Sequence, residues 1–186
     1  MKSAEKKKSV VVFCSASDQA APVFFSEISE LARALVRADF QIVYGGGRSG
    51  LMGRLADEAL ACGGSVVGVI PKYLAKEGIL HPGLTELIVV DDLLDRKRKM
   101  LDLSAAAIAY PGGIGTIDEI TEVLALKQLN EVVKPVVFHN FLQFWDPLFH
   151  FFDELVQRRM IHQKLEDLYV VREGHQEVVE YLNHQI

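Results

Sequence analysis

The stretch AAAIAYPGGIGTIDEITEVLALKQLN, residues 105–130, contains the pattern that decides the fold. A short apolar run ends at Pro111, three glycines follow within four positions, and apolar residues at helical spacing come next. This order predicts a buried strand, a glycine loop and a helix whose N-terminus could hold an anion. However, Asp118, Glu119 and Glu122 stand in the first turns of that helix, where they would repel a phosphate. The acidic residues therefore need their own explanation.

Similar units recur along the chain, because short β-branched runs alternate with amphipathic segments of helix length. This alternation predicts a Rossmann-like, doubly wound parallel α/β sheet of about seven strands with helices on both faces. The helices are expected within residues 22–38, 51–64, 95–106, 116–130 and from 145 onwards, with Gly63 and Gly64 ending the second and with Asp146 as N-cap and Pro147 as first residue of the last. The predicted strands are Val10–Cys14, Gln41–Tyr44, Val66–Ile70, Leu87–Val90, Ala106–Tyr110, Pro135–Phe138 and Leu168–Val171.

Length and composition favour a single globular domain. The length of 186 residues fits a single domain, 1–186, in which residues 1–9 are expected to form a flexible basic tail. Hydrophobic residues make up 49% of the chain, but no apolar run approaches the roughly 20 residues of a membrane helix. Cys14 and Cys62 have no disulfide or metal spacing, which favours a cytoplasmic protein. The net charge of −5 argues against a nucleic-acid partner.

A first glycine loop, YGGGRSGLMG, follows the second predicted strand. Gly45, Gly47 and Gly50 have the G-x-G-x-x-G spacing of dinucleotide-binding proteins. The next strand nevertheless ends VVGVIPK, without the acidic residue that would hold a ribose hydroxyl, and no Gly-Lys-Ser/Thr of a P-loop is present. Taken alone, this loop could be only a tight strand-to-helix turn.

The second loop, PGGIGT, contains Gly112, Gly113 and Gly115 and leads to Thr116 as the expected N-cap. Two glycine loops at strand ends favour a phosphorylated ligand between them. Glu119 has two interpretations, because T-x-x-E is also a capping box in which the glutamate bonds back to the Thr116 backbone. The alternative is catalytic: cleavage of an N-glycosidic bond passes through an oxocarbenium-like state that a carboxylate stabilises.

A basic run, DRKRKM, precedes the strand that leads into Pro111. At helical spacing its four basic residues spread around most of a helix, so at most two of them can face one site. Arginine suits a planar partner with several acceptors, such as a phosphate or a purine edge.

The three motifs YGGGRSGLMG, RKRKM and PGGIGTIDE, in this order, resemble the LOG ("lonely guy") family of cytokinin riboside 5′-monophosphate phosphoribohydrolases. The resemblance runs from Val10 to Pro147 and fades towards the C-terminus. It implies a Rossmann-like homodimer, or an assembly of dimers, that releases an adenine-type base and ribose 5-phosphate without a cofactor or metal. Members are often labelled lysine decarboxylases, but a pyridoxal phosphate enzyme needs a Schiff-base lysine, which neither glycine loop offers.

The resemblance implies a catalytic pair, Arg96 and Glu119. The residues expected to bind the nucleotide are Lys97, Gly45, Gly46, Gly47, Gly112, Gly113, Gly115, Thr116, Glu122, Ser15 and Met100. On this interpretation the glycines hold the 5′-phosphate and the acidic residues face the sugar.

Several positions depart from the family pattern, and these departures leave open which base the protein prefers. CSAS replaces C-G-S-S after the first strand, so the phosphate contacts of Ser15 and Ser17 are open. Glu77 stands one position early, with Gly78 in its place, and Ala125 and Leu126 replace Thr and Trp. Whether the substrate is AMP or a prenylated adenine nucleotide is therefore left open.

Three alternatives compete with this interpretation. A nucleotide-binding or cofactor-carrier protein of the same fold would use Glu119 only as a cap. A dinucleotide-dependent reductase lacks its ribose-binding acid. Binding of single-stranded nucleic acid would need aromatic residues among basic ones, whereas the aromatic residues after position 143 occur with acids at helical spacing, which favours a core or dimer contact.

Overall fold

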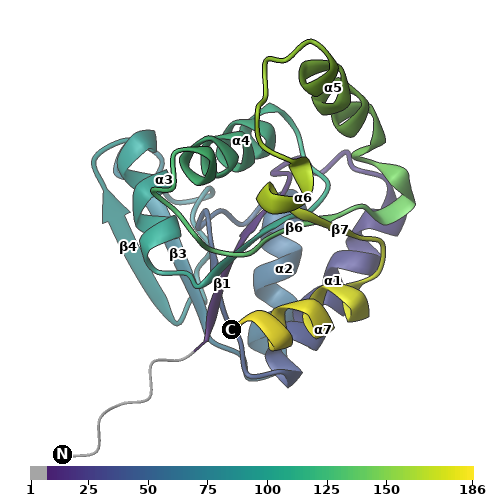
Figure 1. Ribbon diagram of the computed structural model, residues 1–186. Helices are drawn as coiled ribbons and strands as arrows, with labels where there is room; N and C mark the ends of the chain where they lie inside the picture. The colour runs from purple at the N-terminus through teal and green to yellow at the C-terminus, as the bar shows by residue number, and fades with distance from the viewer. Residues whose placement is uncertain (1–7) are drawn as a thin grey trace, which may run out of the picture.

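The computed structural model describes residues 8–186, whose seven strands form one parallel sheet in the order β4-β3-β2-β1-β5-β6-β7 (Figure 1). From β1 the chain moves outward through β2 and β3 to the edge strand β4, and then returns to pair β5 with the other side of β1. The order of strands therefore reverses between β1 and β5. The strands are β1 (Ser9–Phe13), β2 (Gln41–Tyr44), β3 (Val66–Pro71), β4 (Glu86–Val90), β5 (Ala106–Ala109), β6 (Val136–His139) and β7 (Val170–Arg172).

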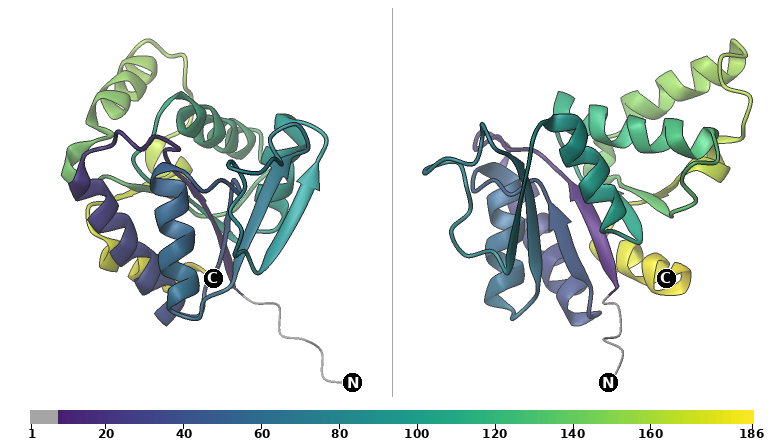
Figure 2. Two further views of the ribbon diagram at one scale, coloured as in Figure 1. Left: turned by 180° about the vertical axis from the view of Figure 1, so that it is seen from behind. Right: turned by 90° about the vertical axis from the view of Figure 1, so that its left-hand side faces the viewer.

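Helices cover both faces of the sheet, as the two views of Figure 2 show. One layer contains α1 (Pro22–Arg37), α2 (Gly50–Ala61) and α7 (His175–Gln185). The other contains α3 (Leu93–Asp102), α4 (Ile114–Gln128), α5 (Asp146–Gln157) and the short α6 (Leu165–Leu168), and a 3₁₀ turn (Phe141–Gln143) precedes α5. The predicted Rossmann-like α/β fold is confirmed.

The alternation of strand side chains divides the core into two parts. Val10 and Val12 of β1 pack towards α1, α2 and α7, whereas Val11 and Phe13 pack towards α3 and α4. All four are at most 2% exposed, because a central parallel strand is buried on both faces. This double burial explains why these strands read as continuous apolar runs.

Helix α3 begins at Leu93, two residues before its prediction, and two predicted N-caps are wrong. Helix α4 begins at Ile114 after Gly113 as N-cap, so Thr116 lies inside the first turn and is not the cap. Helix α5 has Trp145 as N-cap, and Asp146 is its first residue. The Asp146 carboxylate instead accepts a hydrogen bond from Asn140 Nδ2 at 2.8 Å, so a tertiary contact replaces the expected cap.

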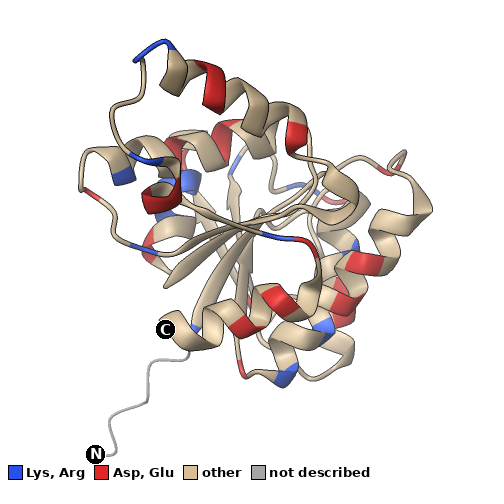
Figure 3. Ribbon diagram, turned by 45° about the vertical axis from the view of Figure 1, so that its right-hand side comes forward, with Lys and Arg blue, Asp and Glu red and all other residues tan. Residues whose placement is uncertain are grey.

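The predicted tail and last strand are also corrected. Ser9 already belongs to β1, and residues 1–7 lie outside the described part of the chain. Leu168 belongs to α6, so the last strand starts later than predicted, at Val170. Within the described residues, no helix combines the length and apolar character needed to cross a membrane. In Figure 3 basic and acidic segments alternate over the ribbon instead of forming one basic face.

Candidate active site

The loops after β1, β2 and β5 meet at the carboxyl edge of the sheet, where strand order reverses and where ligands of such sheets bind. Because β1 lies between β2 and β5, the loop after β1 separates the two glycine loops. A cavity of about 280 Å³ opens between the loop after β1 and the loop after β5. Its lining includes Ser15, Ser17, Phe24, Gly112 and Gly113.

The N-terminus of α2, behind the first glycine loop, is already occupied by a carboxylate of the chain itself. Asp18, in the loop after β1, accepts a hydrogen bond of 2.7 Å from the Gly50 backbone N–H. Gly50 has a φ of +61°, and a β-carbon there would lie 2.5 Å from the Ala16 backbone, so only glycine fits. The G-x-G-x-x-G spacing therefore reflects a packed turn with an internal anion at the helix start.

The N-terminus of α4 is different, because it is open. Gly113 is its N-cap without any side-chain hydrogen bond, and Ile114 is 82% exposed. A β-carbon at Gly113 or Gly115 would meet no atom within 4 Å. The free backbone N–H groups and the positive end of the helix dipole make this position suitable for an anionic group such as a phosphate.

Farther along α4 from its open N-terminus, Glu119 forms a buried ion pair with Arg96 of α3. Arg96 Nη1 lies 3.2 Å from Glu119 Oε1, and the two side chains are only 15% and 10% exposed. Arg96 Nε also donates to the Val69 carbonyl at 3.2 Å. The guanidinium lies against the first glycine loop, since a β-carbon on Gly45 would come within 1.7 Å of Arg96 Nη2. Gly45 thus makes room for Arg96.

Burial changes the protonation of Glu119. Desolvation raises the pKa of its carboxyl to about 7, although Arg96 and Lys97 lower it and Asp118 and Glu122 raise it further. The capping-box interpretation is wrong, because α4 begins before Thr116 and Glu119 points into a buried contact with α3. A carboxyl poised near neutrality beside a fixed cation is typical of catalytic sites.

The other two acidic residues of α4 are neutralised by the second basic residue of α3. Lys97 Nζ lies 3.1 Å from Asp118 Oδ2 and forms a still closer pair with Glu122. Burial lowers the pKa of Lys97, but the hydrogen bonds and charges of Glu122 and Asp118 outweigh it and raise the pKa overall. Arg98, by contrast, is 73% exposed, which agrees with the expectation that at most two of the four basic residues face the site.

The structure brings most of the predicted residues to two neighbouring places. Arg96, Lys97, Glu119, Glu122 and Gly45 form one group between α3, α4 and the first glycine loop. The remaining glycines of the second loop and Ser15 surround the 280 Å³ cavity or the open helix start.

Two of the predicted residues are buried inside the protein, and two more lie within the first glycine loop. Thr116 is 3% exposed and packs against Gly112, and Met100 is 1% exposed in the core beneath α3. Gly46 and Gly47 lie in the first loop, which is held by the segment after β3: His81 N–H donates to the Gly46 carbonyl at 3.0 Å.

Sequence reasoning missed Asp18 and Tyr110. Asp18 stands in the SASDQ loop, where an acidic residue beside a glycine loop was the available signal. Tyr110 directly follows β5, and its hydroxyl donates to the Phe24 carbonyl of α1 at 2.6 Å. Among residues 8–186, no group of three or more His, Cys, Asp or Glu side chains could hold a metal ion.

Comparisons with known proteins point to one family. The model of a family described as possible lysine decarboxylase matches residues 52–182. A cytokinin riboside 5′-monophosphate phosphoribohydrolase of Rhodococcoides fascians is 44% identical over 147 residues, which cover 78% of this chain and 74% of that protein. One of Arabidopsis thaliana is 35% identical over 175 residues, covering 94% and 77% of the two chains.

Among solved structures, the molybdenum cofactor carrier protein of Chlamydomonas reinhardtii has a TM-score of 0.75 at 20% identity, covering 96% of this chain and 98% of its own. The molybdenum cofactor binding protein of Rippkaea orientalis has a TM-score of 0.71 at 18% identity, with 96% of each chain covered. At such identities the likeness shows the shared fold alone. The sequence relatives and the matched family model establish that the chain belongs to the LOG family of cytokinin riboside 5′-monophosphate phosphoribohydrolases.

Proposed function

We propose that this protein hydrolyses the N-glycosidic bond of a nucleoside 5′-monophosphate, AMP or a cytokinin riboside 5′-monophosphate, to a free adenine-type base and ribose 5-phosphate. The observation that carries the proposal is the buried Arg96–Glu119 pair below the open N-terminus of α4. Relatives that are 34–44% identical to this chain are named as cytokinin riboside 5′-monophosphate phosphoribohydrolases. The helix start supplies an anion site, and the carboxyl supplies negative charge where the sugar would lie.

The spacing along α4 suits a nucleotide. Glu119 follows Gly113 by six residues, which is about 9 Å along a helix axis. A 5′-phosphate at Gly112–Gly115 would therefore place the ribose between the helix start and the Glu119 carboxyl. Ser15 and the rest of the loop after β1 would close the phosphate site from the opposite side.

The chemistry follows from the two charges. As the bond between C1′ of the ribose and the ring nitrogen of the base lengthens, its electron pair moves to the base and positive charge develops on the sugar. The Glu119 carboxylate stabilises that charge and orients a water molecule, whose oxygen bonds to C1′ and whose proton the carboxylate accepts. The departing ring nitrogen takes up a proton from solvent, and Glu119 returns its proton to solvent, so that one water molecule is consumed. Arg96 holds the carboxyl in place and favours its ionised form.

A decarboxylase using pyridoxal phosphate fits these residues poorly. A Schiff base forms from a neutral lysine amine, so such enzymes lower the pKa of that lysine. Lys97, the lysine of the Arg96–Glu119 group, has two carboxylate partners and a raised pKa, which keep it protonated. Hydrolysis needs only water as its second reactant.

A carrier protein of the same fold is the less favoured alternative. The molybdenum cofactor proteins resemble the chain only at 18–20% identity, well below the 34–44% of the phosphoribohydrolases. A buried carboxyl with a pKa near 7 would also give a carrier of an anionic ligand no benefit. Retention of nucleotide without turnover would favour the carrier.

The test follows release of free base by chromatography from AMP and from isopentenyladenosine 5′-monophosphate. Arg96→Ala and Glu119→Ala should each lower kcat/KM at least about 100-fold, the usual cost of removing an electrostatic stabiliser. Glu154→Ala is the matched control, because Glu154 forms an exposed pair with Arg158 at 3.1 Å on α5. Near-normal turnover in either site variant would remove that residue from the catalytic pair, and the ratio of the two substrate rates gives the base preference.

The chain is further proposed to act in the cytoplasm as a homodimer or an assembly of dimers. Cys14 and Cys62 are both free thiols, which suits a reducing compartment. Helix α5 exposes Phe151 and Val156, and such apolar surface favours an interface with a second copy.

A further inference from the structure

A second buried charge cluster lies on the opposite face of the sheet from Arg96 and Glu119. Glu27 of α1 has its Oε1 3.1 Å from Nε2 of His139 and 3.0 Å from Nδ1 of His175, and it accepts a third contact from the His175 backbone N–H at 3.0 Å. Burial raises the pKa of Glu27, but the two histidines lower it more, so the carboxylate stays charged. The cluster ties the start of α7 and the end of β6 to α1.

The cluster touches the active-site loop through an aromatic contact. His139 is 0% exposed, and neither of its ring nitrogens makes an aligned hydrogen bond, so its position depends on Glu27 and on packing. Its ring meets the ring of Tyr110 edge to face, with centroids 5.1 Å apart. Tyr110 is the residue directly before Pro111 and the glycines at the start of α4.

Tyr110 connects two walls of the 280 Å³ cavity. Its hydroxyl donates to the Phe24 carbonyl at 2.6 Å, and its backbone N–H donates to the Phe13 carbonyl at 2.9 Å. Phe24 lines the cavity on the α1 side, while Gly112 and Gly113 line it on the α4 side. The Tyr110 hydroxyl therefore links the residue before the glycine loop directly to α1.

We propose that Tyr110 is a positioning residue that sets the width of the phosphate site, and that the Glu27–His139 contact holds its ring from behind. The inference rests on the proposed function, since it assigns the 5′-phosphate to the loop that follows Tyr110. It predicts an effect on the phosphate half of the substrate and none on the base half or on the chemical step.

The test compares Tyr110→Phe and Glu27→Gln with the wild-type protein. For each, KM and kcat are measured with AMP, and the dissociation constants of ribose 5-phosphate and of adenine are measured by calorimetry. Loss of one hydrogen bond should raise KM for AMP and Kd for ribose 5-phosphate together by about 2- to 10-fold. We expect kcat and Kd for adenine to stay within about 2-fold, because the Tyr110 side chain packs on the opposite face of the sheet from the Arg96–Glu119 pair.

The control is Glu30→Gln, the same substitution on the same helix in a half-exposed pair with Arg33. It should change neither ligand affinity. Equal binding of ribose 5-phosphate by Tyr110→Phe and wild type would overturn the inference, as would a parallel loss of adenine binding, which indicates general loosening of the fold. A wild-type protein that binds ribose 5-phosphate but does not cleave AMP would refute the proposed function alone. One that binds no ribose 5-phosphate would refute the inference as well.

Discussion

Glu119 is 9% exposed, and burial raises its pKa to about 7, so acid and carboxylate coexist near neutral pH. Since the carboxylate is the form that stabilises positive charge on the sugar, kcat/KM should rise with pH, with an apparent pKa near 7, and level off above about pH 8. Base release from AMP across this range measures the profile. The phosphate of AMP titrates near pH 6, about one unit below Glu119, so its effect on kcat/KM can be separated from that of Glu119. A flat profile between pH 6 and 8 would contradict the role given to Glu119.

The same carboxyl should make the protein less stable as pH rises. Its folded pKa of about 7 exceeds the ordinary value of 4.5, so the folded state binds more protons between these values and loses stability as pH increases through that window. Glu119→Gln removes this loss. Glu119→Gln also leaves Arg96 without its partner at every pH, so the expected result is a difference: the stability of the variant relative to wild type should be greater at pH 8 than at pH 5 by up to about 3 kcal/mol. Urea unfolding at both pH values tests this, with the exposed Glu154→Gln as control; equal gains at both pH values would contradict it.

At the residue scale, the sequence is informative where a residue type has one chemical use and less so where a contact is tertiary. The resemblance to the family predicts that Arg96 and Glu119 act as a pair, and in the structure the two side chains are in contact. Asp18 at the N-terminus of α2 and Glu27 beside His139 join residues 32 and 112 positions apart. No local pattern encodes such distances, so only the fold reveals them.

In helix α4, one substitution should change the stability of the fold and the binding of substrate in opposite directions. Gly115 lies inside the first turn, and a β-carbon there meets open space in the protein. Gly115→Ala should therefore stabilise the fold by about 0.5–1 kcal/mol, because alanine is the better helix former. It should also raise KM for AMP at least about 10-fold, because the added methyl enters the space proposed for the phosphate. Thermal unfolding and steady-state kinetics measure the two effects.

Gly174→Ala is the control, because Gly174 also stands at a helix start, as the N-cap of α7, and a β-carbon there also meets no atom within 4 Å. It should leave KM unchanged. If Gly115→Ala binds AMP as wild type does, the phosphate does not bind at the start of α4.

At the element scale, strands were easier to predict than helix starts. Each observed strand lies within two residues of its prediction, because strands buried on both faces stand out as β-branched runs. The start of α4 was placed at Thr116 because a threonine followed by a glutamate three residues later has the form of a capping box. The helix begins earlier, at Ile114, with Gly113 as an N-cap that has no side-chain hydrogen bond. A cap without a side chain has no local sequence pattern, and the proposed phosphate site would account for it.

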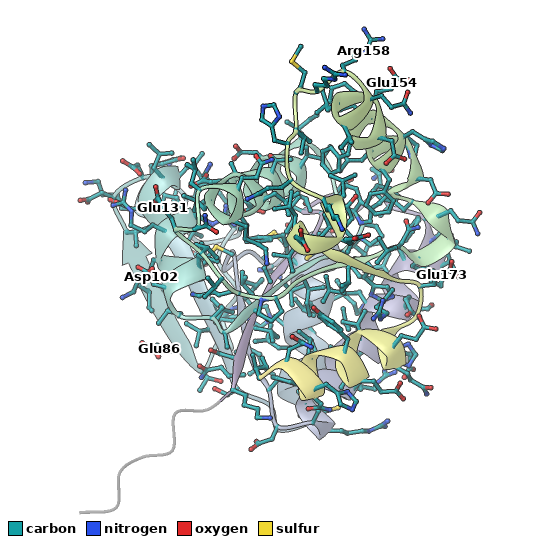
Figure 4. All side chains as sticks on the ribbon, viewed as in Figure 1. Glu86, Asp102, Glu131, Glu154, Arg158 and Glu173 are labelled. Atoms are coloured by element: carbon teal, nitrogen blue, oxygen red, sulfur yellow. The ribbon has the colours of Figure 1, made fainter. Side chains whose placement is uncertain are left out.

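At the scale of the whole molecule, the outer side of α5 is the surface that we propose for a second copy. Helix α5 stands away from the sheet, with Glu154 and Arg158 at its far end (Figure 4), while Trp145 at its start and Phe152 are buried against the core. Its outer side leaves Phe151 58% and Met160, just beyond the helix, 70% exposed. The expectation that the aromatic residues serve the core is thus confirmed for two of them, and the exposed ones are available for the predicted dimer.

We predict that the protein is a dimer, or an assembly of dimers, and that a charge on the outer side of α5 breaks it. Light scattering should give a mass of two chains of 20.7 kDa, or a multiple of it, for the wild-type protein. Phe151→Glu should shift the mass to one chain, because burying an unpaired carboxylate in an apolar interface costs several kcal/mol. Val23→Glu is the control, since Val23 is 43% exposed on α1, in the opposite helical layer, and its change should leave the mass unaltered. A one-chain mass for the wild type at every dilution would contradict dimerisation, whereas a Phe151→Glu protein that remains dimeric would place the interface on another surface than α5.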